Sequence, residues 1–136
     1  MPYLDWSQES ALQLTAADHP ELGTQLEMTL SPALAERLGQ DLQSTFTSGH
    51  HELRLELPAR WTLFWKRASG ETRLLLAHPE KDAWVATLAL DDGACAVLLE
   101  RLAGRGPAES GDRTFRLSEL GPYQRVSNME VAIRLG

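Results

Sequence analysis

The tripeptide His-Pro-Glu occurs twice in this chain, at His19-Pro20-Glu21 and at His78-Pro79-Glu80. Paired imidazole and carboxylate groups can hold a metal ion or transfer a proton. The spacing does not favour these functions, because ligands on one helix face stand three or four residues apart, as in His-Glu-x-x-His. A proline instead favours extended backbone at the residue before it. We therefore interpret both tripeptides as strand ends that enter turns.

The other two histidines, His50 and His51, follow Gly49 at the expected end of a helix and precede Glu52. A cationic imidazole is favourable there, because the helix dipole is negative at its C-terminus. The preferred prediction is therefore no catalytic residue, no metal site and no cofactor. In the alternative, His78 with Glu80 and His51 with Glu52 line a cleft at the strand ends and act as acid-base groups or ligands.

Cys95 is the single cysteine of the chain, so neither an internal disulfide nor a multi-cysteine metal site can form. It lies in the first turn of an expected helix, where the helix dipole lowers the pKa of a thiol. Its neighbours Ala94, Ala96 and Val97 are apolar, and free cysteines are generally buried. A buried, structural Cys95 is the prediction, and a reactive thiol is the alternative.

No P-loop, dinucleotide-binding glycine motif, G-x-S-x-G, EF-hand or kinase motif occurs in the 136 residues. The net charge of −6 repels phosphate backbones, so nucleic-acid binding is not expected. No apolar run approaches the ~18 residues of a membrane span. The first ten residues lack the basic start of a secretory signal. We expect a soluble, cytoplasmic protein.

The strongest candidates for binding are the aromatic residues of the segment RWTLFWKR. In an extended strand Trp61 and Trp65 point to one side and Phe64 points to the other. Large apolar groups on both sides indicate either a strand buried on both faces within the chain or one face that contacts a partner. Burial is the simpler interpretation, and Trp61, Phe64 and Trp65 are the predicted binding residues if one face is free.

Two helices are predicted from their caps and from apolar residues at helical spacing. The first spans about 32–48, with Ser31 as N-cap, Pro32 at the first helical position and a C-cap at Gly49. The second spans about 92–103, is capped by Asp91 or Asp92, and ends before Gly104.

Alternating apolar and polar residues predict strands at 24–30, 114–120 and 129–135 and a four-strand meander over 52–90. Strands joined by short connections are expected to be antiparallel neighbours. The predicted fold is α+β, with a mostly antiparallel sheet of about five to seven strands and both helices packed on one face.

The length fits a single domain over residues 1–136. The segment at 104–113 is predicted to be an exposed loop, because it is rich in glycine, proline and charge. No internal repeat with a period of 20–50 residues is evident.

These observations favour a non-catalytic interaction module that binds a protein partner or forms a homo-oligomer through an apolar and aromatic sheet surface. In size and charge alone the chain is similar to bacterial immunity proteins and secretion chaperones, and no motif carries this likeness. The alternative is a small enzyme or ligand-binding domain that uses the histidines and glutamates at the strand ends.

Overall fold

The computed structural model describes residues 2–19, 23–68, 72–80, 83–103, 114–120, 123–125 and 129–136, and all their side chains except those of 18–19, 72–80 and 123–125. Twelve helices and strands follow one another in the described chain: β1 (Tyr3–Asp5), β2 (Leu12–His19), β3 (Gly23–Leu30), α1 (Pro32–Thr47), β4 (Glu52–Leu57), β5 (Trp61–Arg67), β6 (Thr72–Glu80), β7 (Ala83–Leu90), α2 (Asp92–Leu102), β8 (Thr114–Arg116), β9 (Tyr123–Arg125) and β10 (Met129–Leu135). Short 3₁₀ turns precede β5, at Pro58–Arg60, and follow β8, at Leu117–Glu119.

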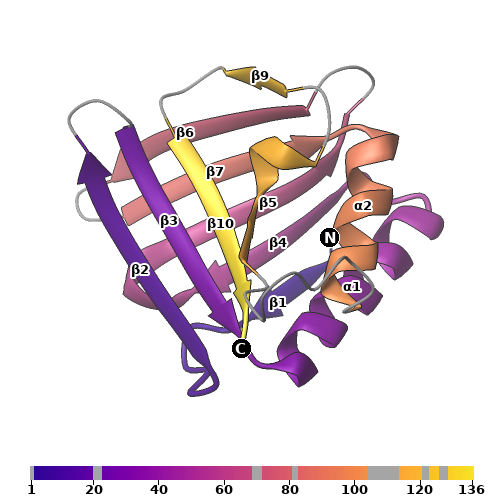
Figure 1. The fold of residues 1–136 in the computed structure, drawn as a ribbon, viewed down its shortest axis with the longest axis horizontal. Coiled ribbons are helices and arrows are strands. Elements are labelled where there is room, and N and C mark those ends of the chain that lie inside the picture. Colours follow the sequence, from indigo (N-terminus) through magenta and orange to yellow (C-terminus); the bar gives the residue numbers. More distant parts are fainter. Residues whose placement is uncertain are drawn as a thin grey trace.

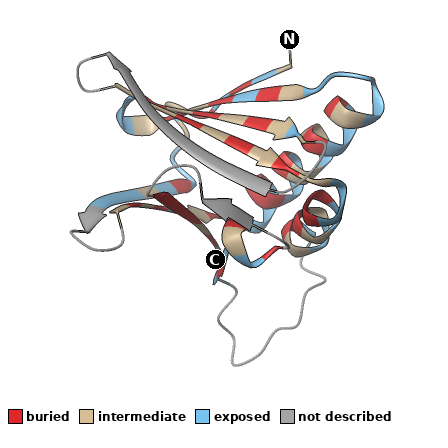
Figure 2. Cartoon of the chain, turned by 90° about the horizontal axis from the view of Figure 1, so that it is seen from above, coloured by how far each residue is buried: buried red, intermediate tan, exposed pale blue. Residues whose placement is uncertain are grey.

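The strands form two sheets. Sheet A has the order β1-β4-β5-β7-β6-β9, and sheet B has the order β2-β3-β10-β8. Sheet A is the back layer in Figure 1, and sheet B and the two helices lie side by side in front of it. Figure 2 shows the same arrangement from above. The α+β class with two helices is confirmed.

The prediction of one mostly antiparallel sheet is wrong, because both sheets are mixed. Strands run parallel in the pairs β1–β4, β5–β7 and β6–β9 of sheet A and in the pair β3–β10 of sheet B. The described strands also outnumber the five to seven that we expected. The strands that we did not predict are β1, β2 and β9, and β1 and β9 have only three residues each, too few for a clear alternating pattern. The strand predicted at 114–120 is shorter than expected, because β8 ends at Arg116 and a 3₁₀ turn follows.

The meander predicted over 52–90 is wrong in its strand order. The pairs β4–β5 and β6–β7 are antiparallel neighbours, as expected. However, β5 pairs in parallel with β7, with Trp61 beside Trp84, and β6 lies beyond β7. The chain between Arg67 and Thr72 has an extended reach of at least ~13 Å, whereas strands two positions apart in a sheet are separated by roughly 10 Å. A short connection can therefore step over one strand.

Both predicted helices form, and their caps explain where they begin and end. The Ser31 hydroxyl oxygen accepts a hydrogen bond from the Leu34 N–H at 3.2 Å, and Pro32 is the first residue of α1. After α1, Gly49 has φ of +85°, the left-handed conformation that glycine adopts without strain. Within the described residues no helix combines the length and apolar character needed to cross a membrane.

The core lies between sheet A on one side and sheet B with the helices on the other. Alternation along each strand decides which residues enter it, as in β4, where Leu53 and Leu55 are buried and Arg54 is exposed. Each buried leucine stabilises the fold by roughly 1.5–3 kcal/mol relative to an exposed one. Residues without exposed surface come from both sheets and from both helices: Met28, Leu30, Leu38, Leu55, Leu63, Trp65, Ala86, Leu88, Leu90, Ala94, Met129, Val131 and Ile133.

The chain contains an internal structural repeat with an offset of 60 residues. Strand β3 (Gly23–Leu30) recurs as β7 (Ala83–Leu90), and the N-cap Ser31 recurs as Asp91. The pairing of β2 with β3 recurs with the same offset in the pairing of β6 with β7. His19 and His78 therefore occupy equivalent places, at or near the end of the first strand of a hairpin that leads into a helix, whereas Pro20 and Glu21 lie outside the described residues.

The first repeat comprises β2, β3, α1, β4 and β5, and the second comprises β6, β7, α2, β8 and β10. The two repeats exchange their last strands. Strand β5 of the first repeat pairs in parallel with β7 of the second, and β10 of the second pairs in parallel with β3 of the first. Each sheet consequently contains two strands from each repeat, in the equivalent orders β4-β5-β7-β6 and β8-β10-β3-β2. Strands β1 and β9 are additions at the two edges of sheet A.

Candidate binding site

The predicted histidine-glutamate pairs lie at opposite ends of sheet A. The strand register places Glu52 of β4 in the same row as Arg73 of β6, whereas Glu80 stands seven residues further along β6. Seven residues of strand span roughly 23 Å. The fold therefore does not bring His51 and Glu52 together with His78 and Glu80, whose side chains lie outside the described residues.

The described pair, His51 and Glu52, makes contacts that join β4 to β5. The Glu52 carboxylate is 3.7 Å from the Lys66 ammonium, and the His51 carbonyl accepts a hydrogen bond from the Arg67 N–H at 3.2 Å. His51 itself is exposed. Among the residues whose side chains are described, no three histidine, cysteine, aspartate or glutamate residues gather in a way that could hold a metal ion.

The thiol of Cys95 lies in the first turn of α2, and the residue is buried, as predicted. Its Sγ atom donates to the Leu90 carbonyl, with 3.7 Å between sulfur and oxygen. Burial raises the pKa of the thiol to about 11, and the Arg67 charge lowers that pKa by a smaller amount. The thiol is therefore protonated at neutral pH, when a nucleophile would have to be ionised.

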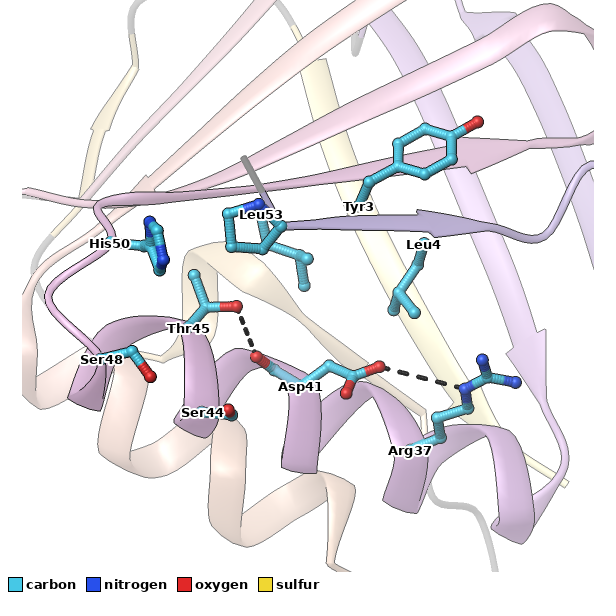
Figure 3. Close-up of a pocket in the computed structure, with 10 residues that line it drawn as sticks. Tyr3, Leu4, Arg37, Asp41, Ser44, Thr45, Ser48, His50 and Leu53 are labelled. Atoms are coloured by element: carbon cyan, nitrogen blue, oxygen red, sulfur yellow. Dashed lines mark hydrogen bonds and ion pairs between the residues drawn. The ribbon is translucent and has the colours of Figure 1, made fainter.

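A polar groove of about 450 Å³ lies between α1 and the strands β1 and β4. Figure 3 shows Arg37 and Asp41 on α1, with 4.0 Å between Arg37 Nε and Asp41 Oδ2. The Thr45 hydroxyl donates to the Asp41 carbonyl at 2.6 Å. On the other side of the groove, Leu4 and Leu53 point from the strands towards α1, and His50 also lines it. Its volume falls within the roughly 300–1,000 Å³ of ligand pockets. Sequence reasoning missed this groove, because it arises where the N-terminal strand joins sheet A beside α1.

The outer face of sheet A, opposite the helices and sheet B, has no described element over it. Tyr3, Arg54 and Phe64 stand in one row on this face, across β1, β4 and β5. The guanidinium carbon of Arg54 lies 5.8 Å from the ring centroid of Tyr3 and 5.9 Å from that of Phe64. Arg54 Nε also donates to the Glu56 carboxylate at 2.7 Å. We call Tyr3, Arg54 and Phe64 the aromatic row.

The three predicted binding residues divide between the core and this face. Trp65 is 0% exposed and Trp61 is 3% exposed, and both point into the core. Trp65 is therefore out of reach of a partner. Phe64 is half-buried and stands on the open outer face. The alternation predicted that these side chains point to opposite sides, but only the folded structure shows which side is covered.

Trp61 takes part in a small pocket at the open end between the sheets. Its ring stacks on that of Trp84 with a centroid distance of 5.5 Å and an interplanar angle of 13°. The two rings, together with Ala16, Ala17 and Thr24, line a volume of about 200 Å³. This is below the roughly 300 Å³ at which ligand pockets usually begin. No sequence pattern predicted this pocket, because Trp84 meets Trp61 only through the unexpected β5–β7 pairing.

Compared with models of protein families, with curated proteins and with solved structures, the chain matches none.

Proposed function

We propose that the protein is a non-catalytic interaction module that binds a protein partner through the outer face of sheet A. The observation that carries the proposal is the aromatic row, because it stands on a sheet face that no described element covers. Tyrosine, phenylalanine and arginine are enriched at protein interfaces. Tyr3 is 53% exposed, which leaves most of one aromatic side chain available for contact.

The fixed position of the Arg54 side chain also favours binding at this surface. Its guanidinium lies against two rings and is hydrogen-bonded to Glu56, so the side chain is held in one position before any partner arrives. A side chain that is already ordered loses less conformational freedom on binding, which otherwise costs ~0.5–1.5 kcal/mol. The aromatic row is thus a preorganised contact surface.

Quantitative affinity purification with Phe64→Ala tests the proposal. We expect specific partners to be retained by the wild type and to bind the variant at least ~10-fold more weakly, the effect of losing a central interface residue. Phe46→Ala is the matched control, because Phe46 is also half-buried but packs against the core from α1. Equal retention by wild type and Phe64→Ala would contradict the proposal.

The alternative is a ligand-binding function. Its support comes from the groove beside α1 and not from the histidine-glutamate pairs, where the sequence predicted it. The groove beside α1 combines a suitable volume with the positive charge of Arg37 and with His50. An NMR titration with small carboxylates and inorganic phosphate tests this alternative. Saturable shifts of signals from Arg37 and His50, lost in Arg37→Ala, would favour it over the interaction module.

A further inference from the structure

The outermost strands of the two sheets differ in length. Strands β1, β8 and β9 have three residues each, whereas β2 has eight. Within the described part of the chain β2 pairs only with β3, and Figure 1 shows it at the margin of the front layer. A long strand with one unpaired side is a template for a further strand, whereas very short edge strands are not.

The segment Leu12–Ala17 of β2 also lacks the residues that usually prevent such pairing, and the charge of Asp18 comes only after it. Its segment Leu12–Ala17 reads LQLTAA and contains no charge, proline or glycine. Natural edge strands are commonly protected by lysine, proline or bulges. The whole chain has a net charge of −6, so an uncharged segment such as Leu12–Ala17 is where two copies of it can approach with least repulsion.

The apolar inner face of sheet B extends onto β2, where its side chains are only partly shielded from water. In β3, Leu26 is 1% exposed and Met28 is 0% exposed. Their partners in register on β2 are Ala16, which is exposed, and Leu14, which is half-buried. The β2 residues are more exposed than their β3 partners because no described strand lies beyond β2. A neighbouring strand would shield Leu14 and Ala16 from water.

The internal repeat shows how this fold covers the equivalent edge. Strand β6 corresponds to β2, and β9 pairs with the outer side of β6 at Thr72–Leu74. The equivalent residues of β2 are Leu12–Leu14, beside which no described strand lies. Among the described strands, the same position therefore carries an added strand in one repeat and none in the other.

From these observations we infer that β2 pairs with β2 of a second copy of the chain, which makes sheet B continuous across a symmetric dimer. A twofold axis perpendicular to the sheet makes the two β2 strands antiparallel and keeps their inner faces on the same side. With Leu14 opposite Leu14 of the second copy, Leu12 pairs with Ala16 and Gln13 pairs with Thr15. Every pair then joins residues of the same face, and no like charges meet within the segment.

Charge variants of Thr15 test this interface in the full-length protein. Thr15 is exposed on the outer face of β2, so a lysine or glutamate there is compatible with the folded monomer. Light scattering after size exclusion should give twice 15.1 kDa for the wild type. Thr15→Lys and Thr15→Glu should each dissociate at least tenfold more readily, because like charges come within about 8 Å across the axis. An equimolar mixture of the two variants should restore the dimer.

A control variant and a measurement of folding distinguish loss of the interface from loss of the fold. Thr87→Lys, on the outer face of sheet A, is the control and should leave the dimer intact, and circular dichroism should show that every variant is folded. A monomeric wild type at high concentration overturns the inference, as does a peptide of another protein that occupies β2 instead. A dimer that resists the Thr15 variants but dissociates in Phe64→Ala also overturns it, while leaving the proposed function in place.

Discussion

Ser31 and Asp91 cap the first turns of the two helices from equivalent positions in the two repeats, 60 residues apart. Ser31 accepts from the Leu34 N–H at 3.2 Å, and Asp91 accepts from the Ala94 N–H at 2.7 Å. Replacing either residue by alanine removes this acceptor. We expect each alanine variant to lower the free energy of unfolding by about 1 kcal/mol in urea denaturation. Asp91→Asn keeps an acceptor oxygen and should retain most of the stability.

Two glycines near α1 should respond to alanine in opposite ways. A Cβ atom at Gly39 would lie 3.5 Å from Leu102 Cβ on α2, which is an ordinary contact distance. Gly39→Ala should therefore stabilise the protein by about 0.5–1 kcal/mol through helix propensity. Gly49 has φ of +85°, so Gly49→Ala should destabilise it by about 1–2 kcal/mol. Urea denaturation measures both, and equal signs would contradict the prediction.

Cys95 should resist alkylation in the folded state. With its thiol pKa raised by burial to about 11, a small fraction is ionised at pH 8, and the side chain is buried as well. We expect iodoacetamide to label Cys95 in urea but not under native conditions, as read by intact mass. Rapid native labelling would restore the alternative of a reactive thiol.

The same thiol makes stability depend on alkaline pH. The unfolded thiol loses its proton near its ordinary pKa of 9.0, whereas the folded thiol keeps it up to about 11. Between these values the unfolded state binds fewer protons, so this contribution is complete below pH 9 and is lost as pH rises towards 11. The advantage of wild type over Cys95→Ala in thermal unfolding should therefore shrink across this window. An unchanged difference would contradict the raised pKa.

Strand β10 should be indispensable for folding, because it lies between β3 and β8 in sheet B. Val131 and Ile133 are both 0% exposed. Ile133→Ala should cost about 2–5 kcal/mol, the usual effect of truncating a buried isoleucine. Arg134→Ala is the matched control on the same strand, because Arg134 is exposed and should change stability by less than about 0.5 kcal/mol.

Several features could be predicted from the sequence because local interactions decide them. The caps Ser31 and Asp91 and the glycine turn at Gly49 act within one turn of a helix. Strand faces were equally predictable, since alternation places Leu53 and Leu55 on one side and Arg54 on the other. Such patterns depend on residues a few positions apart, and the sequence shows them directly.

The candidate surfaces could be predicted only in part. The aromatic segment drew attention to Phe64, but Tyr3 and Arg54 join it through the pairings β1–β4 and β4–β5. The histidine-glutamate pairs had no local geometry to bring them together, and sheet A separates them. Which side chains lie next to each other on neighbouring strands depends on the strand order. The pattern of residues along one strand does not specify that order.

By itself, therefore, the sequence determined where the two helices begin and end and which side of β3, β4 and β10 faces the core. Tertiary structure alone decided that β5 lies parallel to β7, that the two repeats exchange strands, and that β2 is left at an edge. The physical reason is that alternation specifies the buried face of a strand but not its neighbours. Those neighbours are selected by the packing of side chains from both repeats in one shared core.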